Sequence, residues 1–180
     1  MANIVKEFAT VRLTVRPGTL EECDQLVPIL KSWEEQKFVT GRTYICEEYF
    51  IKAINGENIP ANGSKENASF MSIRQKGQDQ IIGFLEVYHG HPHEKTLWIQ
   101  LFVVDKQCRG NKMGKEIIDE LSKQAKEKGF SKLRIGVYLK DWTALRFWAS
   151  MGFDRVTGIH GDTEYRADTF ALMGLEKLLN

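Results

Sequence analysis

The pattern of apolar and polar positions predicts a strand, a helix and a second strand in the later half of the chain. Residues 97–104 form a nearly continuous apolar run, which is typical of a strand buried on both faces. After a turn at Arg109 and Gly110, apolar residues repeat at helical spacing: Met113, Ile117, Leu121 and Ala125. Alternating apolar residues over 133–137 predict a second strand, parallel to the first across a right-handed crossover.

Turn and capping residues divide the first third of the chain. A strand is predicted over residues 11–16, and Thr19 with Glu22 forms a capping box that opens a helix. A second helix is predicted over residues 43–54. The polar segment 55–67 is rich in helix and strand breakers and is predicted to be a flexible loop.

Hydrophobic runs separated by short turns predict the remaining strands. Residues 68–74 and 81–89 form a hairpin, and residues 90–96 make another antiparallel connection to the apolar strand that follows. Strands near 154–159 and 169–175 close the chain. Strands and helices in this order predict an α/β fold.

Size and charge limit the possible functions. With 180 residues, of which 42% are hydrophobic, the chain can bury one core, so a single domain over residues 1–180 is expected. The 25 basic and 24 acidic residues nearly cancel, which argues against nucleic acid or a membrane as partner. No membrane span or signal peptide is evident, so a cytoplasmic location is expected. Three widely spaced cysteines indicate reduced thiols and no metal site.

The turn before the long helix has a specific sequence. From Arg109 the chain reads Arg-Gly-Asn-Lys-Met-Gly, which resembles the pyrophosphate loop of the GNAT acyltransferase superfamily, Gln/Arg-x-x-Gly-x-Gly/Ala. Arg109 and Gly114 match this pattern, and Lys112 stands where the family usually has its first glycine. A loop that enters a helix N-terminus suits an anion, because the first amides of the helix have no intrahelical partners.

A later segment resembles a second motif of the same superfamily. Residues 141–153 read DWTALRFWASMGF, against Asn-x-x-Ala-x-x-x-Tyr-x-x-x-Gly-Phe in the family. Ala144, Gly152 and Phe153 fall on its positions, whereas Asp141 replaces the asparagine and Trp148 replaces the tyrosine. The interval between the two motifs fits one helix and one strand. Two motifs in the right order make the resemblance specific.

The resemblance implies a fold and a reaction. The GNAT fold has a mixed, mostly antiparallel central sheet of about seven strands and about four flanking helices, with two strands splayed at the cofactor site. The implied reaction passes an acetyl group from acetyl-CoA, as cosubstrate and without a metal, to an amine of a small molecule, peptide or protein. A homodimer is possible. The alternatives are a CoA-binding regulatory module with little or no catalysis and, ranked last, a nucleotide-binding domain, because no Walker-type sequence is present.

The resemblance also implies which residues bind the cofactor. The backbone of the strand end would pair with pantetheine: Phe102, Val103 and Val104. The loop would hold the pyrophosphate: Arg109, Gly110, Asn111, Lys112, Met113 and Gly114. The later motif would add Asp141 and Trp148. Lys112 either reaches a phosphate or is tolerated in a first turn that is already helical, and for the backbone the second interpretation is favoured. Cys108 is interpreted as a small apolar filler.

The catalytic residues are less evident. An indole such as that of Trp148 cannot donate a proton near neutral pH, and neither Trp98 nor Gln100, at the family's usual positions for a base, can accept one. A hairpin centred near His93 would set Glu86 opposite Gln100, Tyr88 opposite Trp98 and Phe84 opposite Phe102. Glu86 and Tyr88 would then face the cleft as candidate base and acid. The competing interpretation of Glu86 is an ordinary solvent-facing residue.

The acceptor is expected beneath the two early helices, which roof the cleft in this fold. Candidate contacts are Glu34, Glu35, Phe38 and Arg42. Core packing is the favoured interpretation of the aromatic residues in this region: Trp33, Phe38, Tyr44 and Tyr49. The three histidines of the 89–93 segment are predicted to form an exposed turn instead of a metal site.

Overall fold

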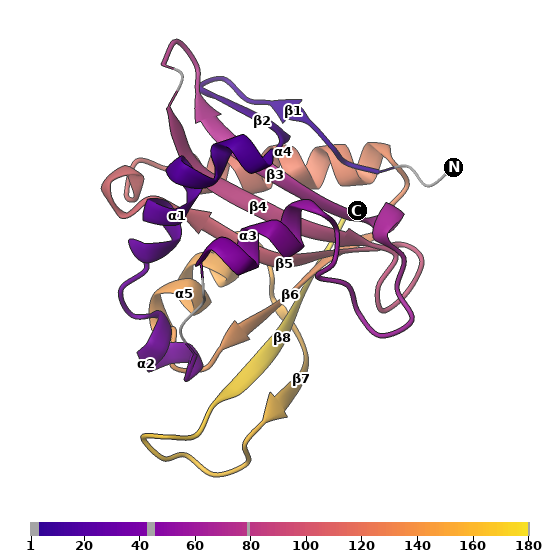
Figure 1. Cartoon of the computed structure of the whole chain (residues 1–180). Helices are drawn as coiled ribbons and strands as arrows, with labels where there is room; N and C mark the ends of the chain where they lie inside the picture. The colour runs from indigo at the N-terminus through magenta and orange to yellow at the C-terminus, as the bar shows by residue number, and fades with distance from the viewer. Residues whose placement is uncertain (1–3, 43–45, 79, 180) are drawn as a thin grey trace.

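The backbone forms one mixed sheet with helices on both faces (Figure 1). The computed structural model describes residues 4–42, 46–78 and 80–179. Within them the strands are β1 (Phe8–Ala9), β2 (Leu13–Pro17), β3 (Ala68–Gln75), β4 (Ile81–His89), β5 (Thr96–Val104), β6 (Lys132–Tyr138), β7 (Arg155–Gly161) and β8 (Ala171–Leu178). The helices are α1 (Cys23–Lys31), α2 (Gln36–Thr40), α3 (Cys46–Ile54), α4 (Met113–Glu127) and α5 (Trp142–Ser150).

The strands lie in the order β1-β2-β3-β4-β5-β6-β8-β7, and each neighbouring pair is antiparallel except β5 and β6. The predicted mixed sheet and its parallel pair across α4 are confirmed. The sequence predicts about seven strands, and the described residues form eight. The additional strand is β1, whose two residues are too few to show a hydrophobic period.

Each face of the sheet carries its own apolar cluster. The cluster beneath α4 and α5 includes Ile117 and Trp148 together with Leu85 of β4. The cluster beneath α1 and α3 includes Leu30 and Phe50 together with Phe84 of β4 and Val103 of β5. Figure 1 shows α1 and α3 in front of the sheet and α4 behind it. A side chain on β4 or β5 is therefore assigned to a face by the cluster that it joins.

Strands β5 and β6 separate after a short paired stretch. Their register runs from Thr96 opposite Lys132 to Ile99 opposite Ile135. Beyond that point β5 continues to Val104, and β6 continues to Tyr138 paired only with β8. The gap leaves the backbone groups at the end of β5 without a partner strand on that side. The splayed strands that the family resemblance implies are thus present.

The early helices differ in detail from the prediction. The capping box of Thr19 and Glu22 is present, but it opens a single 3-10 turn ahead of α1. A short helix, α2, follows where no helical period is evident in the sequence, and α3 is described from Cys46 onward. The predicted start of that helix, residues 43–45 with Tyr44, lies outside the described residues. No helix in the described part of the chain has the length and apolar character of a membrane span.

Candidate active site

The end of β5 leads directly into the loop that is predicted to hold the pyrophosphate. After Val104, a 3-10 turn at Lys106–Cys108 precedes the loop, and α4 begins at Met113. Gly110 has a φ of 82° and Lys112 a φ of 61°, so both adopt the left-handed conformation. The first amides of α4 have no carbonyl to bond one turn earlier and carry the positive end of the helix dipole. The backbone at this point therefore has the geometry and polarity that suit an anion.

The backbone interpretation of Lys112 is wrong. Lys112 is the N-cap of α4 in the left-handed conformation and does not belong to the helical first turn. This conformation favours glycine, because a Cβ crowds the following carbonyl there at a cost of roughly 1–2 kcal/mol. The usual family glycine at this position thus has a conformational reason, and in this chain a lysine adopts the same strained turn.

Side chains from other segments hold the loop in place. The Arg12 guanidinium donates to the Asn111 carbonyl at 3.1 Å and, through Nε, to Glu116 at 2.7 Å. Glu116 also accepts from the Thr10 hydroxyl and the Arg12 amide, and these bonds lower the pKa of Glu116 although partial burial opposes them. The Arg109 side chain folds back, and its Nε donates to the Val104 carbonyl at 2.9 Å. The turn between β1 and β2 therefore braces the loop.

Gly114 lies against two aromatic rings. A Cβ added there would be in tight contact with Phe147 at 3.3 Å and in ordinary contact with Phe102 at 3.7 Å, so a branched side chain would press on both rings. Phe102 and Phe147 also pack with Trp148, which is only 4% exposed. Cys108 packs partly against the same cluster, so the filler interpretation is confirmed.

The second motif positions α5. Asp141 is its N-cap, and its carboxylate accepts a hydrogen bond from the Ala144 amide at 2.9 Å. This places Trp148 against Phe147 and Phe153, with ring centroids 5.1 Å and 4.9 Å away. The aromatic rings fill the α4–α5 face of the gap between β5 and β6. A second substrate must therefore approach from the face that carries α1, α2 and α3.

A β-bulge in β5 changes the predicted strand register. Tyr88 lies opposite Trp98 as predicted, but Glu86 lies opposite Leu101 and Phe84 opposite Val103. The two pairings predicted with Gln100 and Phe102 are wrong, because the bulge inserts one extra residue after Ile99. Gln100 and Leu101 consequently lie on the same face, where Gln100 bonds the 55–67 loop and Leu101 packs in the α1–α3 cluster.

Glu86 is buried on that face. It is 4% exposed, so the solvent-facing interpretation is wrong. The Tyr49 hydroxyl, from α3, donates to Glu86 Oε2 at 2.6 Å. Burial raises the pKa of Glu86, and hydrogen bonds from Tyr49 and the Asn58 side chain act in the opposite direction.

The segment between α3 and β3 is tied to the sheet. The Tyr88 hydroxyl accepts from the Ser64 amide at 2.8 Å, and Tyr88 is 3% exposed. The Gln100 amide group donates to the Asn58 carbonyl at 2.8 Å. The segment is a loop, as predicted, up to the 3-10 turn at Lys65–Asn67, and these bonds hold it against the sheet with Asn58 beside Glu86.

The interpretation of His89 as part of an exposed turn is wrong. His89 completes β4 and is 2% exposed. Its Nε2 accepts from the Val5 amide at 3.0 Å, and Nδ1 is 2.7 Å from the Asn67 carbonyl, which fits a neutral ring protonated on Nδ1. Burial lowers the pKa of His89 to about 4. Among the described residues no group of His, Cys, Asp and Glu is arranged to hold a metal ion.

The family of the protein follows from this geometry together with the sequence match. Residues 28–153, which carry the gap, the loop and both motifs, match the acetyltransferase (GNAT) family. The chain belongs to the GNAT acetyltransferase family. It is therefore an acyltransferase. No curated protein matches the sequence significantly.

Solved GNAT structures share the fold over nearly the whole chain. An acetyltransferase from Thermus thermophilus is 15% identical, with a TM-score of 0.70, covering 95% of this chain and 99% of that one. An N-acetyltransferase from Staphylococcus aureus is 16% identical (TM-score 0.66; 93% and 99% covered). A ribosomal-protein-S5-alanine acetyltransferase from Vibrio fischeri is 10% identical (TM-score 0.69; 98% and 98% covered). At these identities the likeness extends to the fold alone.

This GNAT protein has a cleft beside the end of α2. It measures about 360 Å³ and lies between the end of α2, the end of β6 and the β7–β8 hairpin. Its walls are Thr40, Gly41, Arg42, Tyr138, His160, Gly161, Asp162, Phe170 and Leu172. Of the four predicted acceptor contacts, Arg42 lines this cleft. Tyr138, His160 and Asp162 had no signal in the sequence, because the pairing of β8 with both β6 and β7 brings their segments together.

The other predicted acceptor contacts lie around the cleft. Phe38 is 67% exposed, so the core interpretation is wrong for it, and the Lys140 ammonium lies 5.9 Å from its ring. Glu34 pairs with Lys106 of the 3-10 turn after β5 at 2.7 Å, which lowers the pKa of Glu34. Glu35 is the exposed N-cap of α2. Trp33 and Tyr49 pack partly against the α1–α3 cluster, in agreement with the core interpretation.

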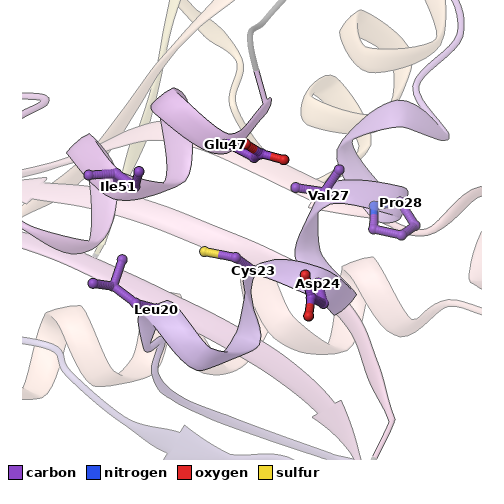
Figure 2. Close-up of a pocket in the computed structure, with 7 residues that line it drawn as sticks. All are labelled: Leu20, Cys23, Asp24, Val27, Pro28, Glu47 and Ile51. Atoms are coloured by element: carbon purple, nitrogen blue, oxygen red, sulfur yellow. The ribbon is translucent and has the colours of Figure 1, made fainter.

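A separate hollow of about 410 Å³ lies between α1 and α3 (Figure 2). It is lined mainly by apolar side chains, and Leu20 and Ile51 at its edge are each 47% exposed. Its walls come from α1, α3 and the 3-10 turn before α1, and no described residue of β5 or β6 is among them.

Proposed function

We propose that this protein transfers an acetyl group from acetyl-CoA to a primary amine of a small molecule, peptide or protein by direct attack. The observation that carries the proposal is the unpaired end of β5, which runs into a left-handed loop and the N-terminus of α4. The gap offers extended backbone for an amide-containing arm, and the loop offers amides for a diphosphate.

Successive backbone segments would bind successive parts of acetyl-CoA. The groups of Phe102, Val103 and Val104 would pair with pantetheine, since β6 has left them, and the Arg109 side chain would release the Val104 carbonyl that it holds. The amides from Arg109 to Gly114 would hold the pyrophosphate, and Arg12 and Glu116 keep this loop in shape. Asp141 and Trp148 would act indirectly, by fixing α5 and closing the rear face of the gap.

The acceptor amine would enter through the cleft at α2. Its walls combine a guanidinium, Arg42, with hydroxyl, imidazole and carboxylate groups, so the cleft suits a polar amine. Glu86 would accept the proton that the amine loses, because it is a buried carboxylate with a raised pKa on the open face of the gap. Tyr88 would support it by anchoring the neighbouring loop.

Binding and turnover together test this proposal. Isothermal titration should show one acetyl-CoA bound per chain, and acetyl-CoA with a panel of amines should release free CoA thiol. The panel comprises the common amino acids, spermidine, kanamycin and a lysine-containing peptide. Binding without thiol release for any amine would favour a CoA-binding regulatory module, for which Trp148 at the family's tyrosine position is the motivating observation. Lack of binding would reject both functions.

The same proposal includes a cytoplasmic location. Cys23, Cys46 and Cys108 are free thiols in the structure, which fits a reducing compartment. Burial raises the pKa of Cys23 and of Cys108, so both thiols stay protonated at neutral pH. Fractionation of cells that express the protein, followed by immunodetection, tests the location.

A further inference from the structure

The geometry points to Tyr49 as a catalytic residue: its hydroxyl carries the proton between the reacting groups and the buried Glu86 carboxylate. Tyr49 lies on α3, outside both sequence motifs. The inference rests on the proposed function, because it supplies the proton acceptor and donor that direct transfer to an amine requires.

The shape of the gap determines where such a residue must lie. On the α4–α5 face, Phe102, Phe147 and Trp148 form a continuous aromatic cluster. Groups that meet the amine must therefore come from the opposite face. Glu86 lies on that face, opposite Leu101, which is the second residue of β5 beyond its last pair with β6.

Tyr49 is the accessible member of the pair. Glu86 is 4% exposed, whereas Tyr49 is only partly buried and donates its hydroxyl proton to Glu86 Oε2 at 2.6 Å. The Tyr49 ring packs on Phe50 and Phe84, with centroids 5.2 Å and 6.2 Å away, and these contacts fix its direction. Of the two residues, Tyr49 is therefore the one with surface exposed to solvent.

Neighbouring polar groups are engaged in holding the loop. The Tyr88 hydroxyl accepts from the Ser64 amide, and the Gln100 amide group donates to the Asn58 carbonyl. Asn58 from the loop and Tyr49 from α3 hydrogen-bond to Glu86, and no charged group contributes to its pKa among the described residues. Burial thus decides the direction in which this pKa moves. A carboxyl group with a raised pKa takes up and holds a proton more readily than an ordinary carboxylate.

The proton balance of the reaction closes with these two residues alone. The neutral amine attacks the thioester carbonyl carbon and forms the C–N bond. The nitrogen then gives one proton to the Tyr49 oxygen, while Tyr49 passes its own proton to Glu86. When the C–S bond breaks, the CoA thiolate takes a proton from Tyr49, which recovers one from Glu86. The products are an amide and CoA thiol, and both side chains return to their initial states.

The test compares two identical substitutions in the full chain. Tyr49→Phe removes the hydroxyl that bonds Glu86, and Tyr165→Phe removes one from a side chain that is 89% exposed between β7 and β8. With acetyl-CoA and the fastest amine of the panel, Tyr49→Phe should lower kcat by about 100-fold or more. The KM and the calorimetric Kd for acetyl-CoA should stay within about twofold. Tyr165→Phe should react at the parent rate.

Two further measurements separate a proton-transfer role from a structural one. The double variant with Glu86→Gln should be no slower than the slower single variant, because the two residues act as one unit. The acidic limb of the remaining Tyr49→Phe activity should move to higher pH, since the lost hydrogen bond had lowered the pKa of Glu86. Parent turnover in Tyr49→Phe, or a loss confined to acetyl-CoA affinity, would overturn this inference alone. Absence of thiol release by the parent with every amine would reject the proposed function itself.

Discussion

The cofactor side and the proton-transfer side of the gap are built in different ways. On the cofactor side, one continuous segment from the end of β5 into α4 offers backbone amides to a ligand. On the other side, Tyr49 and Glu86 are 37 residues apart and act through side chains. A backbone site tolerates unusual side chains, such as the left-handed Lys112, as long as the conformation survives. A side-chain site depends on the identity of each residue.

The largest expected effect is on the cofactor side. Gly114→Val should lower acetyl-CoA affinity at least about 100-fold, because the new side chain would collide with Phe147 and Phe102 and displace the start of α4. Isothermal titration measures the loss. Gly114→Ala, whose Cβ would only be tight against Phe147, should lose less. Parent affinity in Gly114→Val would place the pyrophosphate elsewhere.

The same contrast explains which parts of the site can be predicted from sequence. The loop and the splayed strands follow from a local motif and a hydrophobic pattern, so residues 109–114 are found where the motif places them. Glu86 is predicted on the correct face but with the wrong partner, because nothing in the sequence marks the extra residue at Gln100. Tyr49 has no signal beyond a helical apolar pattern, since its role depends on how α3 packs over β4.

Two further errors have the same physical origin. His89 follows a glutamate and a tyrosine and precedes a Gly-His-Pro turn, a context that suggests exposure, yet the strand places it among buried neighbours. The sequence around Lys112 suggests a helical first turn, but its φ is set by the three-dimensional path from β5 to α4. Neither the burial of His89 nor the left-handed conformation of Lys112 can be predicted from the neighbouring residues in the sequence.

The pH dependence of folding stability can be measured separately from the pH dependence of turnover. The folded-state pKa of His89 is about 4 and its unfolded value about 6.5, so its contribution to stability is complete above pH 6.5 and is lost as pH falls toward 4. The loss amounts to roughly 3 kcal/mol, at about 1.4 kcal/mol for each pH unit. Glu86 has the opposite effect on folding stability. Because its pKa is raised in the folded state, its contribution to stability declines as pH rises.

Urea unfolding of the parent and His89→Gln between pH 4 and 7 measures this effect. The variant should lose less stability than the parent over that range, since glutamine does not titrate and can bond both Val5 and Asn67. Equal slopes for the two proteins would show that the His89 pKa is not depressed in the folded state. The same unfolding data give the pH range in which the protein is folded, and the acidic limb of turnover should be measured within that range.

The smallest expected effect concerns Lys112. Lys112→Gly should stabilise the fold by about 1 kcal/mol, because glycine adopts the left-handed N-cap without strain. The matched control, Lys115→Gly inside α4, should instead destabilise it by about 1 kcal/mol. Thermal unfolding distinguishes the two. Acetyl-CoA affinity should stay unchanged in Lys112→Gly, and a tenfold loss would show that the ammonium group contacts a phosphate.

The separation of the two sides is tested most directly by Glu86→Gln, assayed for acetyl-CoA binding and for turnover in the same preparation. The amide keeps the shape of the carboxylate but cannot accept a proton. We expect a parent Kd for acetyl-CoA, a kcat lower by about 100-fold or more, and no acidic limb in the pH profile. Parent turnover across the pH range, or weakened acetyl-CoA binding with unchanged kcat, would contradict it.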